Sequence, residues 1–554
     1  MMERLKLPKG IHTFEELRTG GYVYVDKTKY LIDLIDNGKS YFLSRPRRFG
    51  KSLTVSTFEA LFLGKKELFQ GLSAEEFLNR PDFQPSPVIR LDMSRINTSD
   101  GIDGVKESIF YLTKEIAREF NVALSETKVN SVLFSDLIQR TAEKYNQKVV
   151  VIVDEYDKPY TDFVNDREMA DKVRNVLRDY YVQIKANDQH IRFVFITGIS
   201  KFVKMGVFST FNNLEDVSMM PEYAEICGYT EDEIIRYFPD YLNETADRMK
   251  IQVDALIERM RQYYNGFCFD REAHSRLYNP FSTLLFFSQK NFSNYWIESG
   301  STRFIAEYMR DRCLTVDQFR NMPVSERFAQ SPGDMDTTRP EGFLYQGGYL
   351  TLRPGISDFL SLDYPNTEVL NSMSELLAQN ILRDSDDDFT YCRSDLLKGL
   401  MNRDYRRIIG ALNRLLASIP YDDFSNAARQ SISYNDYDFD MQEWLYRSTI
   451  LAFLRGCGVV VVAEMHTNRG RPDLVVTHKG QTYIIELKVA DGAENAEKKA
   501  DEALRQCADG NYTQPFPDAA CLCLCIDNET RRIAASRVRQ AMYKYSNNLN
   551  HECL

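Results

Sequence analysis

Apolar runs and amphipathic stretches alternate along the N-terminal part of the chain. The apolar runs predict one β-strand that begins at Tyr41 and further strands that span 87–92, 148–155 and 191–198. Between them, apolar residues recur at helical spacing over 102–120 and 168–185. An unbroken apolar run such as 149–153 is typical of a strand buried on both faces of a parallel sheet. The alternation therefore predicts an α/β fold with a doubly wound, mostly parallel sheet.

The pattern changes twice further along the chain. From about Tyr229 it becomes helical, and the run 278–287 (YNPFSTLLFF) predicts a turn followed by a buried helix. The acidic segment 384–388 predicts a solvated linker, and helices are expected from there to about residue 430. β-rich runs return on both sides of the turn signal Lys479-Gly480, so a second sheet is expected in this last region.

Charged residues interrupt this last β-rich region. Asp473 precedes the first strand of the predicted hairpin, and Glu486 and Lys488 lie on the second. Residues two apart on a strand project from the same face, so Glu486 and Lys488 are expected side by side. Asp473 and Glu486 would hold Mg²⁺, which lowers the pKa of a bound water, and Lys488 would position that water to hydrolyse a phosphodiester. The alternative is an edge strand whose solvent face carries Glu and Lys.

This segment resembles the catalytic core of the PD-(D/E)xK nuclease superfamily, which carries these residue types at this kind of spacing. The resemblance implies an additional acidic ligand on the preceding helix, for which Glu443 in the segment 441–458 is the candidate. A surface glutamate near a helix N-terminus is the alternative. Glu464 is a weaker candidate, and the resemblance implies a supporting role for Gln506 on a predicted helix.

A second candidate site follows the strand that begins at Tyr41. The string 45–52 (RPRRFGKS) closes with Gly50-Lys51-Ser52, the end of a phosphate loop. In such a loop the backbone amides and the helix N-terminus cradle phosphates, Lys51 reaches the terminal phosphates, and the Ser52 hydroxyl binds Mg²⁺. The match is imperfect, because Arg45 takes the place of the first glycine and Pro46 lacks an N–H.

The apolar run 149–153 ends in two acids that fit the same site. The carboxyl ends of strands are where an open α/β sheet places its ligand chemistry. Asp154 would coordinate the Mg²⁺ of a bound nucleotide, and Glu155 would orient the attacking water. A core strand that ends in a solvated acidic turn is the alternative. Thr197 or Ser200, at the end of another strand, would sense the terminal phosphate or simply form a turn.

The N-terminal part resembles the AAA-ATPase-like domain of many gut-bacterial proteins. Its phosphate loop repeats that family's string over 45–52, and the likeness continues through the segments 24–28, 154–157, 197–202 and 278–282. The resemblance implies a P-loop NTPase-type sheet with a helical lid, a nucleotide held by Phe49, Gly50, Lys51 and Ser52, and a C-terminal nuclease-like module. One of Arg45, Arg47 and Arg48 is expected to bind phosphate, unless these arginines pair with acids across a domain interface.

Length and composition set limits on this interpretation. The 554 residues have room for several domains, expected at 1–225 (ATPase core), 226–365 (lid), 366–430 (helical connector) and 431–554 (nuclease-like). No apolar run is long enough for a membrane span and the start lacks a signal-peptide pattern, so a cytoplasmic protein is expected, and the family resemblance implies a bacterial one. The net charge of -11 gives no global footprint for nucleic acid, although a local basic patch would suffice. The alternating Cys521, Cys523 and Cys525 are expected to be buried thiols.

Together these features predict an ATP-binding protein, expected to hydrolyse ATP, that is coupled to a Mg²⁺-dependent nuclease domain acting on DNA or RNA. The alternative is a nucleotide-gated nucleic-acid-binding or signalling protein that does not cut, and a third is an ATPase helper of a mobile element that depends on a partner protein. The convergence of Asp473, Glu486 and Lys488 on one metal position would discriminate between cutting and binding. Assembly with itself or with another protein is left open.

Overall fold

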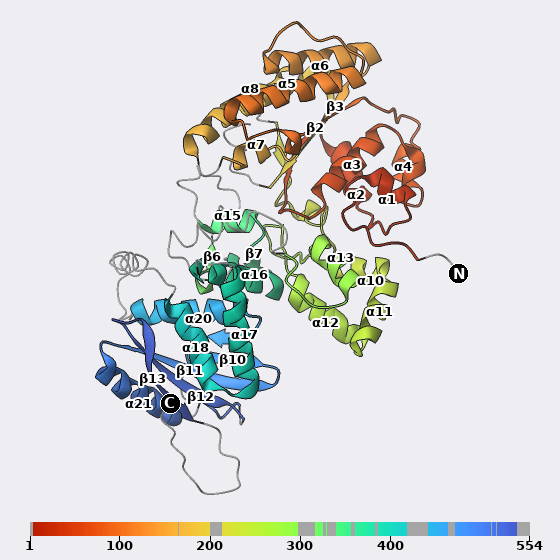
Figure 1. The fold of residues 1–554 in the computed structure, drawn as a ribbon. Helices are drawn as coiled ribbons and strands as arrows, with labels where there is room; N and C mark the ends of the chain where they lie inside the picture. The colour runs from red at the N-terminus through yellow and green to blue at the C-terminus, as the bar shows by residue number, and fades with distance from the viewer. Residues whose placement is uncertain are drawn as a thin grey trace. The chain divides into compact units, whose positions relative to one another are not determined.

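The chain forms two compact units, one of residues 1–299 and 319–368 and the other of residues 300–318 and 369–554 (Figure 1). This computed structural model describes residues 4–163, 166–199, 213–296, 316–324, 328, 340–355, 360–382, 386–417, 441–463, 471–510, 512–516 and 518–539. The finer division into four domains stays a prediction.

A five-stranded parallel sheet forms the centre of the first unit. Its strands are β1 (Ser40–Ser44), β2 (Val88–Asp92), β3 (Val149–Asp154), β4 (Ile191–Gly198) and β5 (Glu215–Asp216). They are ordered β2-β3-β4-β1-β5, and every neighbouring pair is parallel. β4 therefore lies between the strand that leads into the phosphate loop and the strand that ends in Asp154. The predicted parallel α/β sheet is confirmed.

Helices cover both faces of this sheet (Figure 1). The helices of this part of the chain are α1 (Phe14–Thr19), α2 (Thr28–Asn37), α3 (Lys51–Phe62), α4 (Glu75–Leu78), α5 (Gly101–Glu119), α6 (Asn130–Tyr145), α7 (Lys158–Thr161) and α8 (Arg167–Ala186). Of these, α3 packs on one face of the sheet and α5, α6 and α8 on the other. Alternate residues of β4 serve the two faces: Phe193 and Phe195 contact aromatic rings of α3, whereas Val194 and Ile196 join the core beneath α5, α6 and α8. The unbroken apolar runs of the sequence therefore correspond to strands buried on both faces.

Four helices follow the sheet in the chain and form a bundle with its own core. They are α10 (Glu231–Tyr237), α11 (Pro239–Met249), α12 (Val253–Tyr264) and α13 (Pro280–Gln289). Val23 and Val25, from the segment before α2, belong to this bundle's core, so the N-terminal segment is packed against it. This region is helical, as expected, and its role as a lid stays a prediction.

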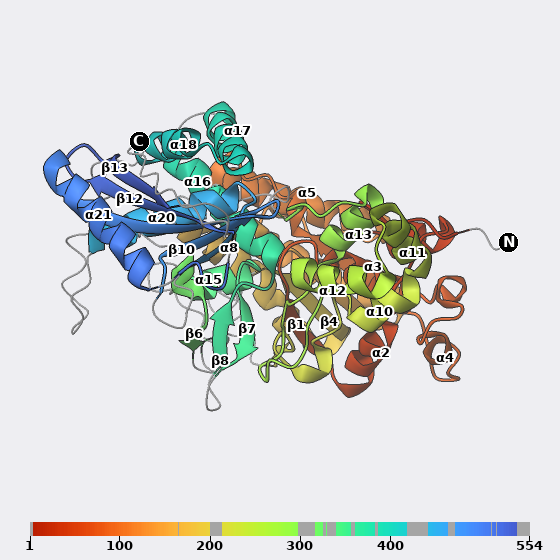
Figure 2. The same cartoon turned by 90° about the horizontal axis from the view of Figure 1, so that it is seen from below.

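The first unit also contains a small antiparallel sheet that the sequence patterns did not predict (Figure 2). Its strands, in the order β6-β8-β7, are β6 (Met322–Val324), β7 (Thr351–Pro354) and β8 (Leu360–Asp363), and α15 (Pro340–Gln346) precedes β7. Strands of three or four residues are too short for an alternating pattern to identify.

The second unit is a five-stranded mixed sheet with helices on both faces (Figure 2). The strands are ordered β13-β12-β11-β10-β9, and only the β11–β12 pair is parallel among the pairs that the structure describes. They are β9 (Val460–Ala463), β10 (Leu474–His478), β11 (Gln481–Ala490), β12 (Ala520–Asp527) and β13 (Arg532–Arg539). The helices are α16 (Thr367–Leu382), α17 (Asp386–Asn402), α18 (Tyr405–Ala417), α20 (Met441–Gly456) and α21 (Ala493–Asp509).

One expected linker is helical over part of its length. The acidic run 384–388 is expected to be a solvated linker, but residues 386–388 begin α17, and residues 384–385 lie outside the described residues. Carboxylates are favourable in the first turn of a helix, because they face the positive end of the helix dipole, so an acidic run is a valid helix start.

The sheet of the second unit separates two apolar layers. Tyr483, Ile485 and Leu487 of β11 pack with α17, α18 and α20, whereas Ile484 packs toward α21. Cys521 and Cys523 lie in the α21 layer as buried free thiols, as expected, and Cys525 packs against alanines of α21. Side chains alternate between the two faces of a strand, so Glu486 and Lys488 lie on the same face of β11 as Ile484, which is the face that α21 covers.

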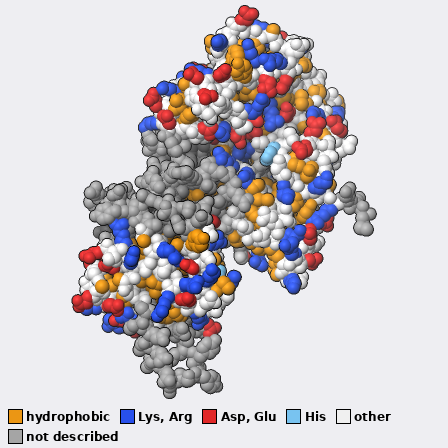
Figure 3. All heavy atoms as spheres, in the orientation of Figure 1, with side chains coloured by type: hydrophobic (Ala, Val, Ile, Leu, Met, Phe, Trp, Pro, Cys, Tyr) orange, Lys and Arg blue, Asp and Glu red, His pale blue; other side chains and the backbone are white. Residues whose placement is uncertain are grey.

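Surface charge and hydropathy add little to the assignment of function. Basic and acidic side chains are interspersed over the described part of the face seen in Figure 3. Within the residues that the structure describes, no helix has the length and apolarity of a membrane span.

Candidate active sites

The phosphate loop, residues 45–50, connects β1 to α3. Its last residue, Gly50, has a backbone conformation that favours glycine. Gly50 has a φ of 98° and directly precedes α3, and its carbonyl accepts a hydrogen bond from the Thr54 amide at 2.9 Å. Arg48 also has a positive φ, of 64°. A side chain at Gly50 would be strained, since L-residues rarely adopt this region. The local sequence therefore directs the chain sharply from strand to helix.

Lys51 folds back over this loop. Its Nζ donates to the carbonyls of Arg45 and Pro46, each at 3.0 Å. Burial lowers the pKa of Lys51, and the negative charges of Asp154 and Glu155 oppose that shift. The ammonium is thus held between the loop and the acids at the end of β3.

Asp154 has the geometry of a cation ligand. It ends β3 as a buried residue, and its Oδ1 has no hydrogen-bond partner among the residues that the structure describes. Burial raises its pKa, while a hydrogen bond from Ser52 and the charge of Lys51 lower it. A buried carboxylate oxygen without a donor is costly unless a cation or water satisfies it. The pair Asp154–Ser52 therefore fits a hard divalent ion.

Glu155 adopts an uncommon backbone conformation next to Asp154. Its φ is 51°, and its side chain is half-buried. Burial raises the pKa of Glu155, and Lys51 opposes the shift. Strained residues of this kind collect at functional sites, where the surrounding structure holds them in place.

A cavity of about 610 Å³ opens beside these groups, and we call it the phosphate-loop cavity. The loop, Lys51, Ser52 and Glu155 line its polar side. Apolar side chains also line it, from Ile11 and Val25 of the N-terminal segment and from Phe281 and Leu284 of α13. A polar loop opposite apolar walls suits a ligand with phosphates and an aromatic base. The segments 24–28 and 278–282, over which the family likeness continues, contribute residues to its walls.

Arg45 does not face this cavity. Its guanidinium is 1 % exposed and donates to the carbonyls of Ser44, Ser218 and Tyr223 at 2.8–2.9 Å. It also lies over the ring of Phe269, with Cζ 4.5 Å from the ring centroid. The arginine that replaces the first glycine of the loop is thus a structural residue that fastens the loop to the chain after β5.

The other residues of the loop divide between cavity and core. Arg47 and Arg48 line the cavity, with Arg48 stacked at 3.7 Å over the ring of Phe281. The Phe49 ring is 1 % exposed and contacts the rings of Phe267 and Phe269. Phe49 can therefore serve a ligand only through its backbone, whereas Arg47 and Arg48 remain candidates for phosphate.

Thr197 contributes to the sheet. Its hydroxyl is buried and donates to the Leu43 carbonyl of β1 at 2.9 Å. This contact favours the structural interpretation of Thr197 over a phosphate sensor. Ser200, the other candidate sensor, lies outside the described residues.

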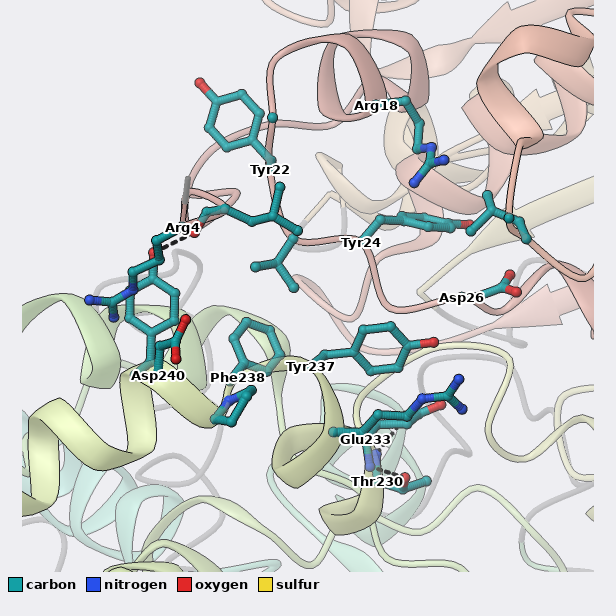
Figure 4. Close-up of a pocket in the computed structure, with 18 of the residues that line it drawn as sticks. Arg4, Arg18, Tyr22, Tyr24, Asp26, Thr230, Glu233, Tyr237, Phe238 and Asp240 are labelled. Carbon is teal, nitrogen blue, oxygen red and sulfur yellow. Dashed lines mark hydrogen bonds between the residues drawn. The ribbon is translucent and has the colours of Figure 1, made fainter. Parts of the chain in front are cut away.

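A second cavity, of about 930 Å³, adjoins the first, since Val23 and Tyr24 line both. Figure 4 shows Tyr24 and Asp26 on one wall and the start of α10 on the other. Lys27 lines the first cavity and Glu233 the second. Lys27 Nζ contacts both carboxylate oxygens of Glu233 at 2.6 Å, and Glu233 also accepts a hydrogen bond from the Thr230 amide at 2.9 Å. An ion pair therefore joins the N-terminal cap of α10 to the segment around Lys27, which lines the phosphate-loop cavity.

In the second unit, Asp473, Glu486 and Lys488 lie together at the start of β10 and the middle of β11. The Asp473 amide donates to Glu486 Oε2 at 3.4 Å, and the Leu487 amide donates to Asp473 Oδ2 at 2.8 Å. Lys488 Nζ lies 3.9 Å from Glu486 Oε1. Both carboxylates are buried, Glu486 at 1 % exposure. The backbone of each strand thus holds the carboxylate of the other.

Other carboxylates surround the side chain of Glu486. Burial and the charge of Asp473 raise the pKa of Glu486 well above its usual range, Lys488 opposes the shift, and Glu443 adds to it. Glu443, in the first turn of α20, is therefore close enough to act on this centre electrostatically. Carboxylates that raise one another's pKa are stabilised when a divalent ion joins them.

Gln506 approaches the centre indirectly. It lies on α21, as expected, and donates to the Tyr512 hydroxyl at 3.3 Å. The charges of Glu486 and Asp473 contribute to a raised pKa of Tyr512, after burial. Glu464, the remaining candidate, lies outside the described residues. The described residues contain no cluster of three or more His, Cys, Asp or Glu side chains arranged to hold a metal.

Two residues near these sites were missed in the sequence. Arg447 of α20 lies 3.4 Å from Asp473, and Tyr512 receives the hydrogen bond from Gln506. Arg447 follows Glu443 by four residues on one helix, and that spacing is the signal that could have identified it. No comparable signal points to Tyr512.

Fold and geometry together define a protein with a P-loop NTPase-type unit and a restriction-endonuclease-like unit. A family model described as predicted AAA-ATPase matches residues 8–208, and a model of the PD-(D/E)XK nuclease superfamily matches residues 441–533. The chain is 33% identical over 527 residues to an uncharacterized protein in the vnfD 5′ region of Azotobacter chroococcum mcd 1, covering 93% of this chain and 94% of that protein. The chain belongs to the family of AAA-ATPase-like proteins with a C-terminal PD-(D/E)XK nuclease superfamily domain.

The buried contacts of Arg45 lead to a prediction about stability. We expect Arg45→Met to lower the free energy of unfolding of the first unit by about 3 kcal/mol, because buried carbonyls lose charged donors. Arg47→Met, in the same loop but half-buried, should change it by less than about 0.5 kcal/mol. Differential scanning calorimetry of the full chain measures both. Equal transition temperatures for the two variants would show that Arg45 is not structural.

Proposed function

We propose that this protein binds and hydrolyses ATP in its first unit, and that its second unit is a Mg²⁺-dependent nuclease for DNA or RNA phosphodiesters. The observation that carries the nuclease assignment is the convergence of Asp473, Glu486 and Lys488. Hydrogen bonds of 2.8 and 3.4 Å join Asp473 to β11, and Lys488 Nζ lies 3.9 Å from Glu486 Oε1 on the same strand. A cytoplasmic location and assembly with itself or another protein stay predictions.

In the first unit the residues have distinct roles. Gly50, Lys51 and Ser52 would hold phosphates, through the loop backbone, the ammonium and the hydroxyl, with Phe49 contributing backbone only. Asp154, with its unpartnered Oδ1, would hold Mg²⁺ together with Ser52. Glu155 would orient the attacking water. When bound, Mg²⁺ neutralises charge that develops on the phosphates.

In the second unit Asp473 and Glu486 would hold the metal, and Glu443 would add negative charge from α20. A bound Mg²⁺ supplies a water of lowered pKa. Lys488, on the same face as Glu486, would position that water or stabilise the negative charge that develops on the phosphate. Nucleotide state in the first unit would gate the cut.

One observation supports the alternative of binding without cutting. The described residues offer two convergent carboxylates rather than three, and a nuclease centre with a weak metal site can bind nucleic acid without hydrolysing it. A nucleotide-gated binding or signalling protein, or an ATPase helper that depends on a partner protein, would retain the first site and lack cleavage.

Substitutions at the first site should separate binding from hydrolysis. We expect Lys51→Ala to weaken ATP binding roughly 100-fold, because the phosphate-facing charge is lost. Glu155→Gln should bind ATP within about twofold of the wild type and hydrolyse it at least about 100-fold more slowly. Isothermal titration and phosphate release measure the two quantities.

Lys172→Ala is the matched control for these variants, since Lys172 is an exposed lysine of α8 that pairs with Glu168 at 2.6 Å. Its affinity and rate should equal those of the wild type. Unchanged ATP affinity in Lys51→Ala would refute the assignment of the phosphate loop.

Substitutions at the second site should abolish cleavage. We expect Glu486→Gln and Lys488→Ala each to reduce cleavage of plasmid DNA or structured RNA, in Mg²⁺ or Mn²⁺, by at least about 100-fold, because a metal ligand or a charge-stabilising group is removed. Gel-based cleavage rates measure the effect.

Arg414→Ala serves as the control in the same unit, because Arg414 is an exposed residue of α18 whose partner is Asp395. It should cut as the wild type does. If the wild type binds ATP but cuts neither nucleic acid under any of these conditions, the nuclease proposal fails and the binding alternative takes its place.

A further inference from the structure

α20 brings a cation to the carboxylate centre of the second unit. Arg447 lies one turn after Glu443, and its Nη1 is 3.4 Å from Asp473 Oδ1. The side chains of Arg447 and Asp473 are 16 % and 11 % exposed, so the contact is largely removed from water. Nothing in the sequence pattern of β10 and β11 requires this third element at the centre.

In both Asp473 and Glu486, the two oxygens of the carboxylate have different kinds of partner. One oxygen of each is held by a backbone amide: Asp473 Oδ2 by Leu487, and Glu486 Oε2 by Asp473 itself. The other oxygen of each faces a protein cation, Arg447 for Asp473 and Lys488 for Glu486. The amides fix the orientation of the carboxylates, and the second pair of oxygens is the pair that a divalent ion would take.

A metal and Arg447 therefore compete for the same oxygen. A guanidinium in contact with Asp473 Oδ1 repels an incoming divalent ion, and the repulsion is strong because the site is shielded from solvent. The guanidinium has another partner when a substrate is present, because its planar fork matches the oxygens of a phosphodiester. An ammonium lacks that fork, which distinguishes arginine from lysine at this position.

We propose that Arg447 exchanges partners. It holds Asp473 when the centre has no metal, and it contacts a non-bridging oxygen of the nucleic-acid phosphodiester when metal and substrate are bound. This inference rests on the proposed nuclease function and assigns the residue through which α20 recognises the substrate. Loss of the side chain should thus favour the metal and disfavour the substrate, whereas a purely structural ion pair would lose affinity for both.

The first test measures metal without substrate. Mn²⁺ is titrated into the full chain by calorimetry, for the wild type, Arg447→Met and Arg447→Lys. We expect Arg447→Met to bind Mn²⁺ about 10-fold more tightly, since a competing charge is removed, and Arg447→Lys to bind like the wild type. Unchanged or weaker Mn²⁺ binding in Arg447→Met would overturn the proposal.

The second test measures substrate. Affinity for a DNA duplex and for a structured RNA is compared in Ca²⁺, and single-turnover cleavage in Mn²⁺. Arg447→Met should bind the cognate nucleic acid at least about 10-fold more weakly and cleave it at least about 100-fold more slowly, and Arg447→Lys should recover binding more than cleavage. Wild-type affinity in Arg447→Met for both nucleic acids would overturn the substrate contact.

Arg537→Met is the matched control, because Arg537 of β13 is 15 % exposed and pairs with Glu497 and Asp501 of α21 at 2.7 Å. It should leave Mn²⁺ affinity and nucleic-acid affinity unchanged, and circular dichroism checks that every variant folds. If the wild type does not cut, the nuclease proposal fails on that result alone. The Mn²⁺ and nucleic-acid affinities still decide whether Arg447 exchanges partners.

Discussion

Both sites of this protein depend on one electrostatic constraint, which is that buried carboxylates require cations. In the first unit Lys51 faces Asp154 and Glu155, and in the second Arg447 and Lys488 face Asp473 and Glu486. Removing carboxylates from water is unfavourable unless opposite charge accompanies them. The protein supplies these cations itself.

The sheets explain how distant residues reach these positions. In the first unit β4 lies between β1 and β3, and all three are parallel, so the phosphate loop and Asp154 meet at one edge. In the second, the pairing of β10 with β11 brings Asp473 opposite the segment around Glu486, thirteen residues later. The Lys27–Glu233 ion pair extends the first site to α10. Any ligand that displaces the segment 23–27 would therefore act on the helical lid, and this is the first link in the proposed gating.

Much of the fold and site could be predicted from the sequence, because both depend on local patterns. Unbroken apolar runs identified β3 and β4, and Asp154 of the first site ends one of them, whereas Glu486 and Lys488 stood out as charges within the apolar strand β11. The rest depends on tertiary contacts. The sequence did not indicate which of Arg45, Arg47 and Arg48 would face phosphate, because the partners that hold Arg45, Ser218 and Tyr223, lie far along the chain. The spacing of Arg447 from Glu443 places both on one face of α20, but the contact of Arg447 with Asp473 depends on how α20 packs against the sheet. The sheet β6-β8-β7 was missed because its strands are too short for periodicity.

The central claim is that nucleotide in the first unit controls phosphodiester cleavage in the second. It is tested most directly by single-turnover cleavage rates of wild type and Lys51→Ala, each with saturating ATP and without nucleotide. The account predicts that ATP changes the wild-type rate at least about 10-fold. It also predicts that Lys51→Ala cuts at the nucleotide-free wild-type rate whether ATP is present or not. Identical wild-type rates with and without ATP would contradict the claim, and the two sites would then work independently.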